Sequence, residues 1–189
     1  MILIASQTGL RFCELIALQW DDLDFNTRRV SVRRAEVRGH IGTPKNNRIR
    51  HIPMTHRVHE TLQRIVPDSP LVFHRQGRSI RYTQALDQLK EACRHAGIRP
   101  ISWHVLRHTF ASELARLGVP LQNTKELLGH ATITMTLRYA HLGPDTLKQS
   151  IAVLDHPKTV WATGGQPDPS THMMEPSQPP DDDTKFRCM

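Results

Sequence analysis

Histidine and arginine residues are concentrated in the segment W-H-V-L-R-H-T-F, which runs from Trp103 to Phe110. His104 and Arg107 are three residues apart, and His104 and His108 are four apart. On a helix either spacing places the pair on one side. Because apolar residues follow in the next turn, we expect His104 and Arg107 to lie at the edge of the core, partly desolvated. For His104 alone, a hydrogen-bonded core histidine is the commoner role.

The spacing of His104 and His108 also suits a pair of zinc ligands. The residues between them are V-L-R, without the glutamate of a metalloprotease, and no third ligand follows. Cys13, Cys93 and Cys188 are too few and too scattered for a zinc site or a disulfide framework. We therefore expect no metal site, and a reduced, cytoplasmic setting.

Two further basic residues stand in positions where they could contact an anion. Arg11 follows the turn at Thr8-Gly9, and Glu14, three residues on, can pair with it and hold it in place. Lys45 lies in T-P-K-N-N-R at the expected tip of a hairpin, where it could move toward a phosphate. Each of these residues, taken alone, is more commonly a solvated surface charge.

The segment L-L-G-H-A-T-I-T-M-T-L-R-Y-A-H contributes a histidine and a tyrosine. Gly129 ends a helix and presents His130 in a tight turn, and Tyr139 follows nine residues later, next to Arg138. Taken alone, Tyr139 is more commonly an interface or half-buried tyrosine than a nucleophile.

Together these side chains suit the binding of a phosphodiester and an attack on its phosphorus. Guanidinium groups can stabilise charge on the phosphate oxygens, and a lysine can donate a proton. A phenol with a pKa near ~10 is only about one part in a thousand ionised at pH 7, so the tyrosine needs a base or cationic surroundings. The sequence lacks carboxylates with metal-ligand spacing and a glycine-rich phosphate loop, so we expect no cofactor. The set comprises Arg11, Lys45, His104, Arg107, His130 and Tyr139.

The charge of the chain points to a polyanionic partner. Three of the 25 basic residues and five of the 18 acidic residues lie in 156–189, so residues 1–155 carry 22 basic and 13 acidic groups, a net charge of +9. Such a body favours nucleic acid as partner, with a merely cationic soluble domain as the alternative. Residues 156–189 hold six prolines and few large apolar residues, which predicts a disordered, proline-rich tail. No apolar run approaches the ~20 residues of a membrane span.

Helical spacing dominates the remaining pattern. The alternation at 29–32 and 49–52, with glycines and a proline between, predicts a small antiparallel sheet. The expected fold class is mostly α with a small antiparallel β-sheet (α+β). Helices are expected over 10–18, 56–66, 83–95, 103–117, 121–128, 132–139 and 144–154, after a partial one at 2–5, with a short extended piece at 71–73.

Five blocks of the chain closely resemble the tyrosine recombinases, the family that includes phage integrases and Xer-type resolvases. They appear in the family's order and at its usual separations, and they lie within residues 1–155. The blocks are T-G-L-R-F-C-E-L-I-A-L-Q-W-D-D-L-D, P-K-N-N-R-I-R-H-I-P-M, W-H-V-L-R-H-T-F-A-S, L-L-G-H and T-L-R-Y-A-H.

The resemblance implies a role for each matching residue. Arg11 and Arg107 would clamp the non-bridging oxygens of the scissile phosphate, and Lys45 would protonate the leaving 5′ oxygen. His104 and His130 would hydrogen-bond the phosphate and assist proton movement. Tyr139 would attack the phosphorus and form a 3′-phosphotyrosyl bond, without metal or ATP, and Glu14 would support the site.

The same resemblance implies double-stranded DNA as partner and 1–155 as the catalytic domain. Family members usually carry an N-terminal helical domain that completes a clamp around DNA; this chain starts ten residues before Arg11, so we expect that domain to be absent. Residues 144–154 could dock on a neighbouring protomer of a tetramer on DNA, or cap their own core. A DNA-binding remnant without recombinase activity and a topoisomerase-like relaxing activity remain alternatives.

Overall fold

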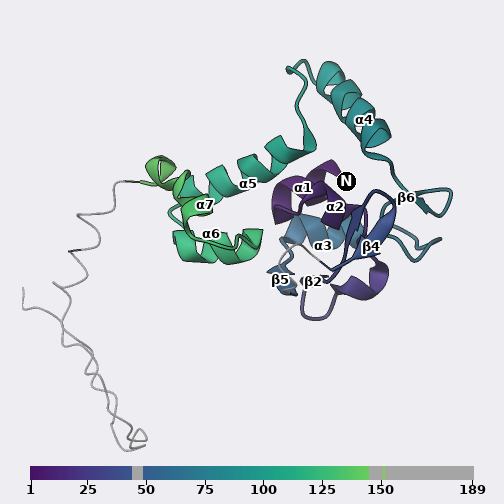
Figure 1. Ribbon diagram of the computed structural model, residues 1–189, viewed down its shortest axis with the longest axis horizontal. Helices are drawn as coiled ribbons and strands as arrows, with labels where there is room; N and C mark the ends of the chain where they lie inside the picture. The colour runs from purple at the N-terminus through teal and green to yellow at the C-terminus, as the bar shows by residue number, and fades with distance from the viewer. Residues whose placement is uncertain (44–48, 145–150, 152–189) are drawn as a thin grey trace, which may run out of the picture. The chain divides into compact units, whose positions relative to one another are not determined.

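The computed structural model describes residues 1–43, 49–144 and 151, and the chain divides into two units after Asp145. All the elements named here belong to the first unit (Figure 1). The expected tail, 156–189, and most of 144–154 lie outside the described residues. The helices are α1 (Ile2–Thr8), α2 (Phe12–Leu15), η1 (Trp20–Asp22), α3 (His56–Gln63), α4 (Tyr82–His95), α5 (Trp103–Arg116), α6 (Leu121–Leu128), α7 (Thr134–Leu137) and η2 (Ala140–Leu142), where η marks 3₁₀ geometry.

The strands are short and antiparallel throughout the described residues. The largest sheet has the order β1-β2-β5, and β3 pairs with β4 and β6 with β7. The expected fold class, mostly α with a small antiparallel sheet, is confirmed. The strands are β1 (Leu23–Asp24), β2 (Arg29–Val32), β3 (Ala35–Val37), β4 (His40–Gly42), β5 (Arg50–Pro53), β6 (His74–Arg75) and β7 (Arg78–Ser79).

The pairing of β2 with β5 confirms the predicted hairpin strands with a shift of one residue. Val30 faces Ile52 across the ladder, both side chains are buried, and Val32 faces Arg50. Since successive side chains of a strand point to opposite faces, Arg50 shares the inward face of β5 with Ile52. An arginine is thereby aimed toward the interior.

The helix expected over 10–18 is wrong beyond its first turn. In the structure α2 ends at Leu15, because the backbone that follows pairs with the chain after α3 instead of with itself: Trp20 N–H donates to Pro70 O and Val72 N–H to Leu18 O. Leu15 and Leu18 are nevertheless both buried, as the apolar pattern indicated.

Several other boundaries also differ from the expectations. The helix expected over 56–66 ends at Gln63, and the one expected over 132–139 covers only Thr134–Leu137, with Ile133 at its N-cap position. The extended piece at 71–73 forms one isolated bridge, from Gln19 to Leu71. The expected helices 83–95, 103–117 and 121–128 match α4, α5 and α6 to within one residue at each end.

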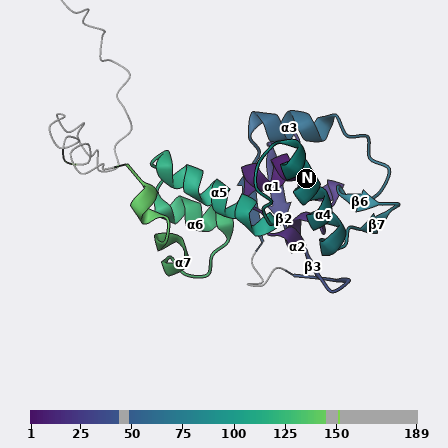
Figure 2. The same cartoon turned by 90° about the horizontal axis from the view of Figure 1, so that it is seen from above.

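Helix α5 connects two apolar clusters. Its first turn, with Trp103 and Leu106, packs into the main core, where α5 contacts α1 and where buried residues of the β1-β2-β5 sheet also lie. Its later turns meet α6 and η2 in a second cluster, and α6 in turn contacts β5 and α7. Figures 1 and 2 show α5, α6 and α7 together in both views. The second cluster comprises Ala111, Ala115, Leu128 and Tyr139, with Phe110 and Leu142 against it.

No helix within 1–43 and 49–144 combines the length and the apolar character that crossing a bilayer requires.

Gly9, at the end of α1, lies close to the ring of Phe110 on α5. It ends α1 with a left-handed backbone, φ +62°, which L side chains rarely adopt. A Cβ atom at this position would lie 2.4 Å from Phe110 Cδ1 and 3.0 Å from Leu128 Cδ2. Both the backbone angle and the close approach therefore require glycine in the T-G-L-R segment.

We expect Gly9→Ala to lower the free energy of unfolding by about 2–4 kcal/mol, combining positive-φ strain with overpacking against Phe110. Gly39→Ala is the matched control: Gly39 also has positive φ, +82°, but nothing lies within 4 Å of its Cβ position. Gly39→Ala should lower the free energy of unfolding by only about 1 kcal/mol. Urea unfolding of both variants measures the difference, and equal losses would show that the contact with Phe110 does not matter.

Candidate active site

Arg107 joins the carboxyl ends of two helices. Its Nη1 donates to Gly9 O at 2.6 Å and its Nη2 to Leu128 O at 2.7 Å, at the ends of α1 and α6. The last carbonyls of a helix lack intrahelical partners and lie at the negative end of its dipole. A guanidinium is therefore a favourable partner there, and its position is set by both helices.

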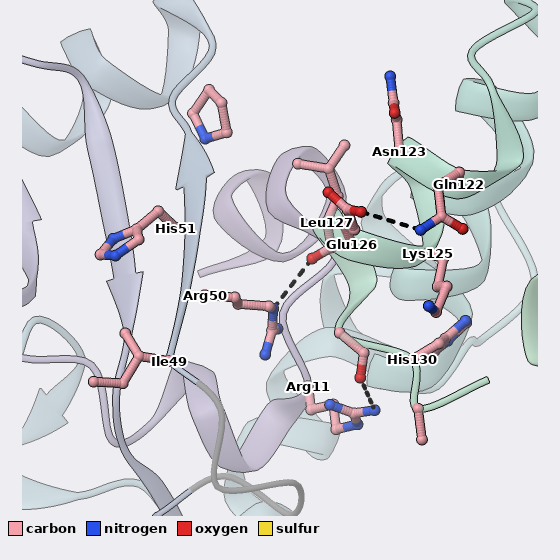
Figure 3. A pocket seen from close by; sticks show the side chains of 13 residues that line it. Arg11, Ile49, Arg50, His51, Gln122, Asn123, Lys125, Glu126, Leu127 and His130 are labelled. Atoms are coloured by element: carbon pink, nitrogen blue, oxygen red, sulfur yellow. Dashed lines mark hydrogen bonds between the residues drawn. The ribbon is translucent and has the colours of Figure 1, made fainter. Parts of the chain in front are cut away.

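Two more arginines donate to the same end of α6. Arg50 Nε donates to Leu127 O at 3.1 Å, and Arg11 Nη2 donates to Gly129 O at 3.4 Å. Figure 3 shows both hydrogen bonds as dashed lines, one from each arginine to the end of α6. Gly129 has φ +65°, and a Cβ atom there would lie 3.0 Å from Arg50 Cδ. Glycine at the end of α6 thus makes room for the arginine from β5.

Glu14 holds Arg11 and Arg50 with both of its carboxylate oxygens. Oε1 accepts from Arg11 Nη1 at 3.0 Å and from Arg50 Nη1 at 2.9 Å, while Oε2 accepts from Arg50 Nη2 at 2.7 Å and from the Arg11 backbone N–H at 2.8 Å. The carboxylate is buried. Burial alone would raise the pKa of Glu14, but the hydrogen bonds and charge of Arg50, with those of Arg11, hold this pKa below its ordinary value.

Arg11, His104 and Arg107 line one small cavity of about 170 Å³, beside the rings of Phe12 and Trp103. Arg107 is 4% exposed. Its burial, together with the charge of Arg11, lowers its pKa to about 10, so it is still cationic at neutral pH. Its two carbonyl bonds use two of the five N–H groups of a guanidinium, which leaves three for an anion in the cavity.

His104 and Arg107, both expected at the edge of the core and partly desolvated, differ in burial: Arg107 is buried, whereas His104 is largely exposed with its ring partly desolvated, as expected. The reason is their different directions on α5: Arg107 turns to the carbonyls of α1 and α6, and His104 lies edge to face against His108, 4.5 Å between ring centroids. Partial burial of the ring and the charges of Arg107 and Arg11 lower the pKa of His104.

His130 follows Gly129 at the end of α6, as the sequence indicated. It lines a cavity of about 1010 Å³ between β5 and α6, together with Arg11, Arg50 and Lys125 (Figure 3). Partial burial and then the charges of the nearby arginines lower the pKa of His130 to about 4, so its ring is neutral at pH 7. Its Nδ1 lies 2.9 Å from Thr136 Oγ1, which orients the ring.

Tyr139 lies between α7 and η2, with its ring in the second apolar cluster and its hydroxyl against an imidazole. Tyr139 Oη and His108 Nδ1 share a hydrogen bond of 2.5 Å. Burial raises the pKa of Tyr139, and the charges of Arg138 and Arg107 partly oppose this effect. The phenol is therefore protonated at neutral pH in the structure.

The structure thus brings together five of the six residues predicted from the sequence. Arg11, His104 and Arg107 share the small cavity, Arg11 and His130 share the large one, and Tyr139 is linked to His104 through His108, which contacts both. Lys45 lies outside the described residues.

Sequence reasoning missed Arg50 and gave His108 no role beyond a rejected zinc pair. Strand alternation could have identified Arg50, because it places this side chain on the same, inward face of β5 as the buried Ile52. The signal for His108 is its helical spacing from His104. In the described part of the chain, no three His, Cys, Asp or Glu side chains are grouped as metal ligands would be.

Comparison with known proteins gives one consistent result. The family model described as the phage integrase family matches residues 1–145. A tyrosine recombinase XerD from Rhizobium meliloti (strain 1021) is 37% identical over 147 residues, covering 71% of this chain and 44% of that protein. The chain spans about half the length of the curated relatives that it matches.

Solved structures show the same relation. The Tn1549 transposon integrase, in complex with a circular intermediate DNA, superposes with a TM-score of 0.68 at 26% identity, covering 82% of this chain and 56% of that one. The catalytic domain of bacteriophage HP1 integrase superposes with a TM-score of 0.59 at 26% identity, covering 83% of both chains.

We expect Glu14→Gln to lower the free energy of unfolding at pH 7 by about 3 kcal/mol, because it leaves two guanidinium groups without their buried carboxylate. The pKa of Glu14 is below its ordinary value of 4.5 in the folded protein, so its charge stabilises the fold above that pH. The difference between wild type and variant should be complete at pH 7 and should shrink as the pH falls below about 4.5.

Glu113→Gln is the matched control, since Glu113 pairs with Arg116 on the exposed face of α5. Glu113→Gln should lower the free energy of unfolding by no more than about 1 kcal/mol. Guanidinium chloride unfolding of both variants at pH 7 and pH 4 gives the comparison. A Glu14→Gln effect that is as small as the control, or unchanged at pH 4, would show that Glu14 does not hold the arginines as an anion.

Proposed function

Because the chain belongs to the phage integrase family, we propose that it cleaves and rejoins double-stranded DNA through a covalent bond between Tyr139 and the 3′ phosphate of the cut strand. The observation that carries this proposal is the convergence of Arg11, His104 and Arg107 on one small cavity. These residues come from the N-terminus of α2 and from α5, and they provide two guanidinium groups and an imidazole for a single phosphate.

In the proposed reaction, Arg11 and Arg107 bind the non-bridging oxygens of the scissile phosphate. Negative charge accumulates on these oxygens as the nucleophile attacks, and preorganised donors that meet such charge supply a large part of catalysis. Arg107 is held by two carbonyls and Arg11 by Glu14, so both heads are in place before DNA arrives. His104 donates a further hydrogen bond to the phosphate, and His130 joins from the adjoining cavity.

The oxygen of Tyr139 attacks the phosphorus, and the bond from phosphorus to the 5′ oxygen breaks. Lys45 donates a proton to the leaving oxygen, which becomes a free 5′-hydroxyl. The 5′-hydroxyl of a partner strand then attacks the phosphotyrosyl bond and releases Tyr139. Because the bond energy is kept in the protein–DNA ester, the cycle needs no nucleotide.

DNA as the partner is supported by the charge of the body and by the solved relatives. Residues 1–155 carry a net charge of +9, and the similar Tn1549 integrase was solved in complex with DNA. Association of protomers through residues 144–154 stays a prediction, as does the disordered tail over 156–189, since both fall almost wholly outside the described residues.

The nucleophile is tested with a DNA substrate that carries a nick near the cleavage point, so that the cut strand diffuses away and the covalent adduct accumulates. Wild type should give an adduct that resists denaturation, and Tyr139→Phe should give none. Tyr82→Phe is the matched control at the other tyrosine of the chain, and its adduct should persist. An adduct in Tyr139→Phe would mean that another residue is the nucleophile.

The same assay separates the alternatives. DNA binding without an adduct at any concentration of wild type would support a remnant that binds DNA and no longer reacts. Relaxation of supercoiled plasmids without a specific site would support a topoisomerase-like activity.

The clamp is tested by Arg107→Lys, which keeps the charge but cannot reproduce a planar, two-point grip. We expect cleavage to slow by about a hundredfold or more, the loss typical of one removed transition-state donor. Arg138→Lys is the matched control on an exposed arginine near the site, and it should change the rate by no more than about threefold, as surface substitutions usually do. Single-turnover rates give both values, with thermal unfolding as a check on folding. Equal losses would show that the clamp is misassigned.

A further inference from the structure

His108 is the imidazole that contacts the nucleophile. Its Nδ1 lies 2.5 Å from Tyr139 Oη, and the two rings are tilted by 51° with centroids 6.0 Å apart. The other two histidines of the site are engaged elsewhere: His130 Nδ1 lies against Thr136 Oγ1, and His104 lies edge to face on His108 itself. Neither His104 nor His130 shares this contact with the hydroxyl.

The contact between Tyr139 and His108 is partly shielded from solvent. Tyr139 is 6% exposed, and its ring packs in the apolar cluster of α5, α6 and η2. His108 is half-buried on α5. Few waters can therefore reach the hydroxyl to take its proton, so a fixed acceptor is needed for the phenol to become a nucleophile.

The charged groups that face His108 favour its neutral form. His104 and Arg107 lie on the same helix, and Arg138 and Tyr139 lie on the segment after α7. Partial burial, followed by the charges of His104, Arg138 and Arg107, lowers the pKa of His108. At neutral pH the ring is uncharged, and the tautomer with its proton on Nε2 leaves a lone pair on Nδ1 for the phenol.

We propose that His108 is the general base of strand cleavage, taking the Tyr139 proton on Nδ1 as the phenol oxygen attacks the phosphorus. This role rests on the proposed function and adds one catalytic residue to it. His108 touches a reacting atom, the phenol oxygen, and lies one position beyond Arg107 on the same helix.

The bonds and protons of the proposed cycle balance. On cleavage the proton moves from Tyr139 Oη to His108 Nδ1, the bond from Oη to phosphorus forms, the bond from phosphorus to the 5′ oxygen breaks, and the 5′ oxygen takes the proton that the proposed function assigns to Lys45. On rejoining, the attacking 5′-hydroxyl returns that proton to the lysine as its oxygen bonds to phosphorus, the bond from Oη to phosphorus breaks, and His108 returns its proton to the phenolate. Partial burial and the charges of His104, Arg138 and Arg107 disfavour the imidazolium, which favours this return.

The test compares His108→Asn with wild type, because the asparagine Oδ1 can occupy the place of Nδ1 and accept the hydrogen bond but cannot hold the proton at pH 7. Single-turnover cleavage of the nicked substrate should slow by about a hundredfold or more, the usual contribution of a general base. DNA affinity and thermal unfolding should stay close to those of wild type. The matched control is His95→Asn, at an exposed histidine of α4, which should cleave at the wild-type rate.

A second experiment distinguishes proton transfer to His108 from a role of His108 in positioning Tyr139. A fluorinated tyrosine with a lower phenol pKa is incorporated at position 139 by genetic code expansion, in wild type and in His108→Asn. A phenol that ionises by itself needs no base, so cleavage by His108→Asn should recover at least tenfold, while wild type should change little. A role in packing or orientation would give no such recovery.

The outcomes distinguish this role from the proposed function. Wild type that forms no Tyr139-dependent adduct overturns both. Wild type that forms the adduct, with His108→Asn cleaving as fast or faster, overturns the role of His108 alone and identifies the contact as one that restrains the resting tyrosine. A slow His108→Asn that the fluorinated tyrosine does not rescue also overturns proton transfer to His108.

Discussion

The carboxyl ends of α1 and α6 are the constraint on which the rest of the site depends. Three arginines donate to the carbonyls there, and one of them, Arg107, bonds to both helices at once. Unpaired helix carbonyls need donors, and the negative end of each dipole favours cations, so the fold and the anion site are stabilised by the same contacts. Moving either helix end would displace the guanidinium groups and expose the carbonyls together.

Glycine makes this arrangement sterically possible. Gly9 admits the ring of Phe110 and Gly129 admits the side chain of Arg50, and both positions have a left-handed backbone. The carboxylate of Glu14 then neutralises part of the positive charge of the arginines, and each of its oxygens accepts a hydrogen bond from both Arg11 and Arg50. The result is that Arg107 stays cationic at neutral pH beside His130, whose ring stays neutral because its partial burial, and then the charges of the nearby arginines, lower its pKa.

Much of this site could be anticipated from local pattern. Helical spacing on α5, the glycine stops and the alternation of β2 each reflect short-range backbone physics, so α4, α5 and α6 agree with the expectation to within a residue at each end. The helix expected to continue to Leu18 ends early because of a long-range contact. The backbone after α2 forms hydrogen bonds with a segment some fifty residues later, and no local sequence pattern contains such a pairing. Arg107 shows the same limit, since its burial follows from hydrogen bonds to Gly9 and Leu128, which lie far from it along the chain.

The sequence by itself determined the chemical inventory, the fold class and the family, because residue type and spacing along the chain are enough to identify them. Only the tertiary structure decided which groups meet. That Arg50 reaches Glu14 and Leu127, and that His108 rather than His104 contacts the hydroxyl of Tyr139, follows from the packing of α6 against α5 and β5 and of η2 against α5. These contacts join residues up to 77 positions apart, and hydrogen bonds over such separations arise from three-dimensional packing, which periodicity does not encode.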